Sequence, residues 1–205
     1  INAGINSNVV WQLNQRLPTI LSAKPNVVIV LIGTNDVMGS FHKADGNTYK
    51  RKGHLPSVPT QANYQRELRK LLRHLHAVKH VGVCTLPPLG ENPNSPINRL
   101  VSSFNDDIRC IVTEENKVLI PLGESLFEVL HKRQCLPSED YKPGPIHRLI
   151  PIIQALSDHY IDHESWDQSA ANRGLHLLPD HIHLGERGGC ILADLIANYL
   201  EINTG

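Results

Sequence analysis

Residues 27–36 read VVIVLIGTND, and this stretch decides the fold class. Its first six residues are all apolar with no polar alternation, which is typical of a strand buried on both faces. Lys24, Pro25 and Asn26 mark a turn before the run, and Gly33 marks its end. We therefore predict a buried strand over 27–32 that leads directly into a polar turn, GTND.

Amphipathic patterns surround this strand and repeat along the chain. Ser95 followed by Pro96 is typical of a helix N-cap and first turn, and an apolar stripe follows it. Apolar strands that alternate with amphipathic helices indicate a parallel sheet covered by helices on both faces. This is an α/β fold with three layers in the order α/β/α. Helices are predicted around 9–21, 64–78, 96–112, 124–131, 145–161 and 191–200, and strands over 27–32, 80–86 and 117–121.

Composition predicts one globular domain over 1–205. Apolar residues make up 40% of the chain and charged residues 20%. Twenty basic and twenty acidic residues cancel, and no basic face or tail is visible, so neither nucleic acid nor a membrane surface is expected as a partner. The longest apolar run is far shorter than the roughly 20 residues that span a bilayer. The chain shown therefore has no predicted transmembrane segment.

The four cysteines are widely spaced and form no CxxC pair. This spacing favours neither a zinc knuckle nor a redox dithiol. We expect Cys84, Cys110, Cys135 and Cys190 to be ordinary thiols, with a disulfide as the less favoured alternative.

Polar groups that follow strands are the first candidates for a site, because functional residues of parallel sheets gather at the carboxyl ends of the strands. Asn35 follows the predicted strand directly, and its amide can stabilise an oxyanion. Alternatively, Asn35 and Asp36 cap their own backbone in a turn. Gly4, in the tripeptide NAG, lets a backbone N–H approach a ligand closely, or is simply a turn glycine.

An acid and a histidine precede the last predicted helix. Asp180 and His183, in the stretch DHIHLG, are three residues apart. An aspartate at hydrogen-bond distance fixes the tautomer of an imidazole and stabilises the imidazolium that forms when it accepts a proton. The alternative is a pair of solvated loop residues.

A second group of acids and histidines raises the possibility of metal chemistry. Two imidazoles one helical turn apart, with carboxylates beside them, can begin a metal site. No third and fourth ligand is identifiable and no HExxH motif is present, so we expect no metal and rank a metal-dependent hydrolase last. The group comprises Asp158, His159, Asp162, His163 and Glu164.

Taken in order, three motifs resemble those of the SGNH or GDSL-like hydrolase family. They are NAG at 2–4, GTND at 33–36 after the stretch RLP and a later proline, and DxxHL from Asp180 to Leu184 before a helix. The resemblance covers essentially the whole chain. It extends to TLPPL at 85–89 and FNDDI at 104–108.

The resemblance implies a flavodoxin-like parallel sheet and a serine ester hydrolase that works through an acyl-enzyme without a cofactor. Within it, Gly4 and Asn35 would form the oxyanion hole, while Asp180 and His183 would complete the triad with a serine. The expected substrate is an ester of a small molecule, a lipid or a carbohydrate. His181 occupies a position where many relatives carry glycine, and we expect it to take no part in catalysis.

One element of the family pattern is missing from the chain. The GDS-type nucleophile motif, which follows the first strand, should precede Asn2. Ser7 opens a predicted helix and Ser40 follows GTND in a predicted loop, so neither has the setting of that serine. We therefore expect the chain to lack its N-terminal strand and nucleophile block, and to be inactive alone. The alternative is a non-catalytic binding protein on the same fold.

Overall fold

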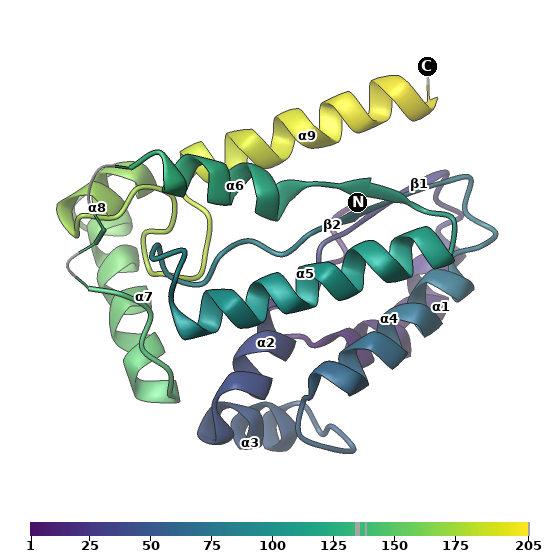
Figure 1. The fold of residues 1–205 in the computed structure, drawn as a ribbon, viewed down its shortest axis with the longest axis horizontal. Coiled ribbons are helices and arrows are strands. Elements are labelled where there is room, and N and C mark those ends of the chain that lie inside the picture. The colour runs from purple at the N-terminus through teal and green to yellow at the C-terminus, as the bar shows by residue number, and fades with distance from the viewer. Residues whose placement is uncertain (134–135, 138, 205) are drawn as a thin grey trace.

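A parallel three-stranded sheet forms the centre of the protein (Figure 1). The structure is a computed structural model that describes residues 1–133, 136–137 and 139–204. The strands β1 (Val27–Val30), β2 (His80–Cys84) and β3 (Val118–Ile120) lie in the order β1-β2-β3. In register, Val28 faces Val81 and Val83 faces Leu119. The predicted α/β class is confirmed.

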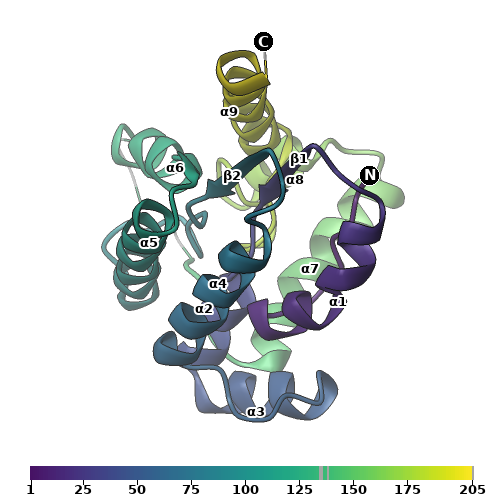
Figure 2. The same ribbon diagram turned by 90° about the vertical axis from the view of Figure 1, so that its right-hand side faces the viewer.

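Helices cover both faces of this sheet (Figure 2). Alternate strand residues point to opposite faces, so Val30 and Val83 belong to one apolar core while Ile29 and Ile120 belong to the other. The first core is covered by α1 (Val10–Ser22), α4 (Gln61–His74) and α5 (Pro96–Glu114), and the second by α6 (Leu122–His131) and α9 (Glu186–Thr204).

Gly82 in β2 explains how α9 packs so closely on the sheet. A Cβ atom at this position would lie 2.7 Å from Ile120 Cδ1 and 3.1 Å from Tyr199 Cζ. The missing side chain therefore makes room for the Tyr199 ring of α9 and for the Ile120 side chain of β3.

The predicted start of α5 is confirmed in detail. The Ser95 side chain accepts a hydrogen bond from the Asn98 backbone N–H, and Pro96 is the first helical residue. The predicted helix around 9–21 is present as α1, but the placement of Ser7 at its start was wrong, because the helix begins at Val10. Ser7 lies in the preceding turn with a φ of 64°, which is incompatible with a right-handed helix.

Short polar helices are the main difference from the prediction. GTND is not a turn: Gly33, with a φ of 136°, is the N-cap of α2 (Thr34–Phe41). The Tyr64 ring packs where a Gly33 side chain would stand, so only glycine fits there. Ser40 lies within α2 and not in a loop. The chain then continues into α3 (Lys43–Lys52), and α8 (Trp166–Asn172) was likewise not predicted.

The strands are also shorter than predicted. β1 ends at Val30 instead of residue 32, and β2 ends at Cys84 instead of residue 86. Leu31 is 39% exposed, because the chain leaves the sheet before it enters α2. The predicted helix over 145–161 is present as α7 (Pro145–Tyr160), which packs against α3 and α8.

Two further expectations concern membranes and cysteines. In the part of the chain that the structure describes, no helix is both long and apolar enough to cross a bilayer. Cys84 is a buried free thiol, and Cys110 and Cys190 are exposed free thiols. Cys135 lies outside the described residues.

Candidate active site

Asn35 is positioned by the end of β1 and the first turn of α2. Its Nδ2 donates to the Asn8 backbone carbonyl at 2.9 Å, and its Oδ1 accepts from the Tyr49 hydroxyl at 2.7 Å. The second Nδ2 hydrogen has no partner among the described residues. The alternative in which Asn35 caps its own backbone is therefore wrong, and one amide hydrogen is available to an oxyanion.

Gly4 lies just before the turn that ends at Asn8, whose carbonyl binds Asn35. The Asn8 N–H donates to the Ile5 carbonyl at 3.2 Å, and Arg16 Nη1 donates to the Ala3 carbonyl at 2.9 Å, which anchors the segment. The Gly4 N–H donates to Asn2 Oδ1 at 2.9 Å. An oxyanion at this N–H would therefore replace the Asn2 side-chain oxygen.

Asp180 and His183 form a close pair in the loop before α9. His183 Nδ1 lies 2.6 Å from Asp180 Oδ2, and Asp180 Oδ1 accepts the backbone N–H groups of Ile182 and His183 at 3.0 and 2.8 Å. Asp180 is 5% exposed, whereas the His183 side chain is 66% exposed. The acid is thus held inside the protein while the imidazole reaches the surface.

The electrostatics of this pair suit proton transfer. Burial raises the pKa of Asp180, but the hydrogen bonds from His183 and Ile182 outweigh it, so the pKa lies below its usual value. The hydrogen bond to Asp180 raises the pKa of His183 above its usual value. Since Nδ1 faces the carboxylate, Nε2 is left to exchange a proton with another group. Nε2 has no hydrogen-bond partner among the described residues.

A buried glutamate after β2 holds the loop that carries this pair. The Glu91 carboxylate accepts the backbone N–H groups of His176, Leu177 and Leu178 at 2.8, 2.6 and 2.9 Å. Arg133 forms an ion pair with the same carboxylate. Glu91 is 1% exposed. Sequence reasoning missed Glu91, because nothing in a glycine- and proline-rich loop indicates a partner so far along the chain.

His181 is fixed in a different way from His183. Its backbone has a φ of 68°, a left-handed conformation that favours glycine. The Gly90 N–H donates to the His181 carbonyl at 2.8 Å. The ring is buried, and burial lowers its pKa. Among the described residues, no hydrogen bond links this ring to Asp180 or His183.

Asn35 and the anchor of the loop that carries the dyad, Asp180 and His183, follow the carboxyl ends of neighbouring strands. Asn35 follows β1, and the Asp180–His183 loop is attached to Gly90 and Glu91, which follow β2. Carboxyl ends of parallel strands lie at the same edge. The described residues nevertheless include no direct hydrogen bond between the dyad and Gly4 or Asn35.

Neither rejected serine approaches the dyad. Ser40 Oγ donates to the Asp36 carbonyl within α2 at 2.7 Å, and Ser7 lies in an exposed turn. In the described part of the chain, no serine hydroxyl is hydrogen-bonded to His183.

Asp36, next to Asn35, is buried and not exposed to solvent. Its Oδ2 accepts the Val10 N–H at the start of α1 at 3.1 Å. A small cavity of about 30 Å³ separates it from Glu67 and the loop around Leu55. Burial raises the pKa of Asp36 to about 8, so this carboxyl is mostly protonated at neutral pH.

Two of the five acids and histidines considered for a metal, Asp158 and His159, join α7 to α8. Asp158 Oδ2 accepts from Arg173 Nη2 at 2.5 Å and from Ser169 Oγ at 2.7 Å. The His159 ring stacks on Trp166 with centroids 4.0 Å apart. Within 1–133, 136–137 and 139–204, no three such side chains come together in a way that could hold a metal ion.

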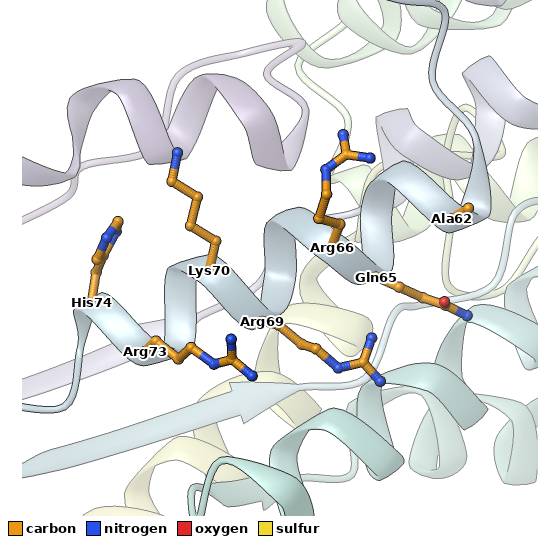
Figure 3. A pocket seen from close by; sticks show the side chains of 7 residues that line it. All are labelled: Ala62, Gln65, Arg66, Arg69, Lys70, Arg73 and His74. Carbon is orange, nitrogen blue, oxygen red and sulfur yellow. The ribbon is translucent and has the colours of Figure 1, made fainter.

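Basic side chains gather on one side of α4, although no basic face was expected. A hollow of about 550 Å³ lies along the exposed side of this helix (Figure 3). Three of its arginines are paired with acids at 2.9–3.2 Å, which neutralises most of its charge. It shares no residue with the candidate site, so we interpret it as a solvated helix face. Its lining residues are Ala62, Gln65, Arg66, Arg69, Lys70, Arg73 and His74.

Comparisons with solved structures support the fold. The acetylxylan esterase Axe2 from Geobacillus stearothermophilus superposes with a TM-score of 0.65 at 19% identity, over 98% of this chain and 71% of its own. The acetyl xylan esterase AlAXEase gives a TM-score of 0.62 at 18% identity, over 96% and 78%. Catalytic mutants of Axe2 replace a serine, an aspartate and a histidine, the last two being three residues apart.

A comparison with curated proteins found no match. The model of the GDSL-like Lipase/Acylhydrolase family matches residues 1–148, a range that contains Gly4 and Asn35 and ends before Asp180. This range is well over half of the chain. The protein therefore belongs to the GDSL-like lipase/acylhydrolase, or SGNH, family.

Proposed function

We propose that this protein is the acid–base and oxyanion-binding part of a serine esterase that cleaves carboxylic esters through an acyl-enzyme. The observation that carries the proposal is the 2.6 Å contact between Asp180 Oδ2 and His183 Nδ1, with Nε2 left unpartnered among the described residues. Family membership supplies the class of reaction. The aspartate and histidine of the Axe2 catalytic mutants have the same spacing, which supports these two roles.

In the proposed reaction, His183 Nε2 takes the proton of a serine hydroxyl as its oxygen attacks the ester carbonyl. The oxyanion of the tetrahedral intermediate accepts hydrogen bonds from Asn35 Nδ2 and the Gly4 N–H. Protonated His183 then gives its proton to the departing alcohol, leaving an acyl-serine. Water attacks the acyl group with His183 again as base, which releases the acid and restores the serine.

The nucleophile is proposed to precede Asn2, where the family motif order places it. The structure offers a setting for the strand that would carry it. Within the described chain β1 pairs with β2 alone, so its other edge has unpaired backbone groups. A further parallel strand at that edge would end beside Asn35, at the same side of the sheet.

We propose an acetylated carbohydrate as the first substrate class to test. Axe2 is described as an acetyl-xylooligosaccharide esterase and AlAXEase as an acetyl xylan esterase. Both share the fold of this chain over nearly its whole length.

The test compares the present chain with the protein translated from any reading frame that continues before Ile1. We expect no turnover of p-nitrophenyl acetate by the present chain above background, and turnover by the longer protein. A fluorophosphonate probe should label a serine before Asn2, as located by mass spectrometry. Labelling of Ser7 or Ser40 would contradict the proposal. A folded longer protein that binds acetylated xylo-oligosaccharide without cleaving it would instead establish a non-catalytic binding protein.

A further inference from the structure

The Asn35 amide lies at the end of a hydrogen-bonded chain that begins at a buried ion pair. Arg148 Nη2 lies 2.9 Å from Asp45 Oδ1, and Arg148 Nη1 donates to the Tyr49 hydroxyl at 2.7 Å. The Tyr49 hydroxyl in turn donates to Asn35 Oδ1 at 2.7 Å. Asp45 is fully buried. These contacts therefore link α7 to the neighbouring helices α2 and α3, and Arg148 lies 99 residues after Tyr49 in the sequence.

The donors and acceptors in this series of hydrogen bonds can be arranged in only one way. A guanidinium has donors only, so Tyr49 must use an oxygen lone pair to accept from Arg148. The single hydroxyl hydrogen is then directed to Asn35, which requires the amide oxygen and not the nitrogen to face Tyr49. On the other side, the Asn8 carbonyl accepts from Nδ2 at 2.9 Å. A flipped amide would place two oxygen atoms against each other at Asn8.

We propose that Tyr49, oriented by Arg148 and Asp45, is a positioning residue that holds the Asn35 amide with its N–H toward the developing oxyanion. This inference rests on the proposed esterase function. Tyr49 does not touch the reacting atoms; it removes the alternative orientation of the amide, in which a carbonyl oxygen would repel the oxyanion.

The surroundings of Tyr49 keep this arrangement in place. Arg148 Cζ lies 5.3 Å from the centre of the Tyr49 ring, so the guanidinium contacts both the ring and its hydroxyl. Asp45 Oδ2 accepts the Gly144 N–H at 2.8 Å, which fixes the start of the helix that carries Arg148. His42 Nδ1 lies 3.2 Å from the same oxygen. Burial raises the pKa of Tyr49 to about 12, so the hydroxyl keeps its hydrogen at neutral pH.

The chain contains a matched control for this position. Tyr141 is also a buried tyrosine near Asp45 and Arg148, but its hydroxyl has no hydrogen-bond partner among the described residues. Tyr49→Phe and Tyr141→Phe therefore remove the same atom from similar surroundings. Only the first substitution removes a contact with Asn35.

The kinetic test uses the longer, nucleophile-containing protein, with folding checked by circular dichroism. We expect Tyr49→Phe to lower kcat roughly 10-fold to 100-fold with little change in KM, below the 100-fold to 1,000-fold loss that removal of an oxyanion donor by Asn35→Ala typically causes. Tyr141→Phe should stay within about twofold of wild type. The double variant Tyr49→Phe/Asn35→Ala should be no slower than Asn35→Ala, because both act through one amide.

A second measurement separates this inference from the esterase proposal. This measurement uses the present chain, because it does not require the nucleophile. The two side-chain amide protons of Asn35 should give separate NMR signals that are protected from exchange. Tyr49→Phe should shift these signals, and Tyr141→Phe should leave them unchanged. If the longer protein has no turnover but the signals behave this way, the esterase proposal fails and the positioning stands. A wild-type kcat in Tyr49→Phe, a loss that multiplies with that of Asn35→Ala, or unchanged Asn35 signals would overturn it.

Discussion

The carboxylate of Glu91 accepts a hydrogen bond from the backbone N–H of Leu177 at 2.6 Å, across 86 residues of sequence. Two neighbouring backbone N–H groups and Arg133 bind the same carboxylate. This contact attaches the loop with Asp180 and His183 to the segment that follows β2. The position of Asp180 and His183 therefore depends on a side chain outside this pair.

Glu91→Gln should destabilise the protein by about 3–5 kcal/mol, the usual cost of breaking a buried ion pair by removing one partner. The amide nitrogen of glutamine is a donor, so it would face other donors at this position. Urea unfolding monitored by circular dichroism measures the change. Glu128→Gln is the control, because Glu128 forms an exposed pair with Lys132 at 2.6 Å and its replacement should change stability far less than Glu91→Gln does. Equal effects of the two substitutions would show that Glu91 does not hold the loop.

In the nucleophile-containing protein, Asp180 and His183 should behave as one unit. We expect His183→Ala to lower turnover by on the order of 1,000-fold or more and Asp180→Ala by less, with the double variant close to His183→Ala alone. His181→Ala should remain within about tenfold of wild type, a difference of about 1.4 kcal/mol, since its ring lies outside the pair. Initial rates on one ester decide this. A nearly wild-type His183→Ala would end the esterase assignment, and small additive losses at all three positions would indicate a solvated loop.

Asp36 should make stability fall as pH rises through the neutral range. Its pKa of about 8 in the folded protein exceeds the unfolded value near 3.9, so the folded state binds more protons between these values. The stabilisation is complete below about pH 4 and is lost as pH approaches 8, by at most about 1.4 kcal/mol per pH unit.

Urea unfolding of wild type and Asp36→Asn at pH 5 and pH 8 tests this sign. The variant should gain stability relative to wild type at the higher pH, because asparagine has no proton to lose. Asp106→Asn serves as control, since Asp106 is exposed and paired with Arg109. If wild type and Asp36→Asn keep a constant difference at both pH values, the carboxyl is ionised throughout and the prediction is wrong.

Gly82→Ala should destabilise the protein by about 1–3 kcal/mol, because its Cβ would overlap Ile120 on β3 and crowd Tyr199 on α9. Gly189, inside α9, has no atom within 4 Å of an added Cβ. Gly189→Ala should therefore stabilise by about 0.5–1 kcal/mol through helix propensity. Thermal unfolding of both variants gives the comparison. Opposite signs are expected, and a neutral Gly82→Ala would mean that α9 can move away from the sheet.

The sheet and its long helices could be predicted because each carries a strong local pattern. The apolar run at 27–32 located β1, and the stripe after Pro96 located α5. The helix α2 escaped prediction because it is only eight residues long and starts at a glycine that also suits a turn. For α3, ten mostly polar residues leave only Asp45, Gly46 and Tyr49 buried, so no apolar stripe marks it.

In the candidate site, too, only the residues marked by a local pattern could be predicted. Asn35 follows a strand, and Asp180 and His183 are close in sequence, so motif order was enough to select them. Their supporting residues could not be found in this way. Tyr49 contacts Arg148 across 99 residues, and such a pair has no local signature in a single sequence.

The attachment of the loop that carries Asp180 and His183 by Glu91 and Gly90 also bears on how the protein responds to heat. These contacts lie outside the hydrogen-bonded ladders of the sheet, so the segment around 174–185 can open while β1, β2 and β3 stay paired. Proteins open locally at a lower free energy than that of global unfolding. Amide hydrogens in this segment would then exchange with solvent ahead of those in the strands, and heat would release the Asp180–His183 loop before the sheet unfolds.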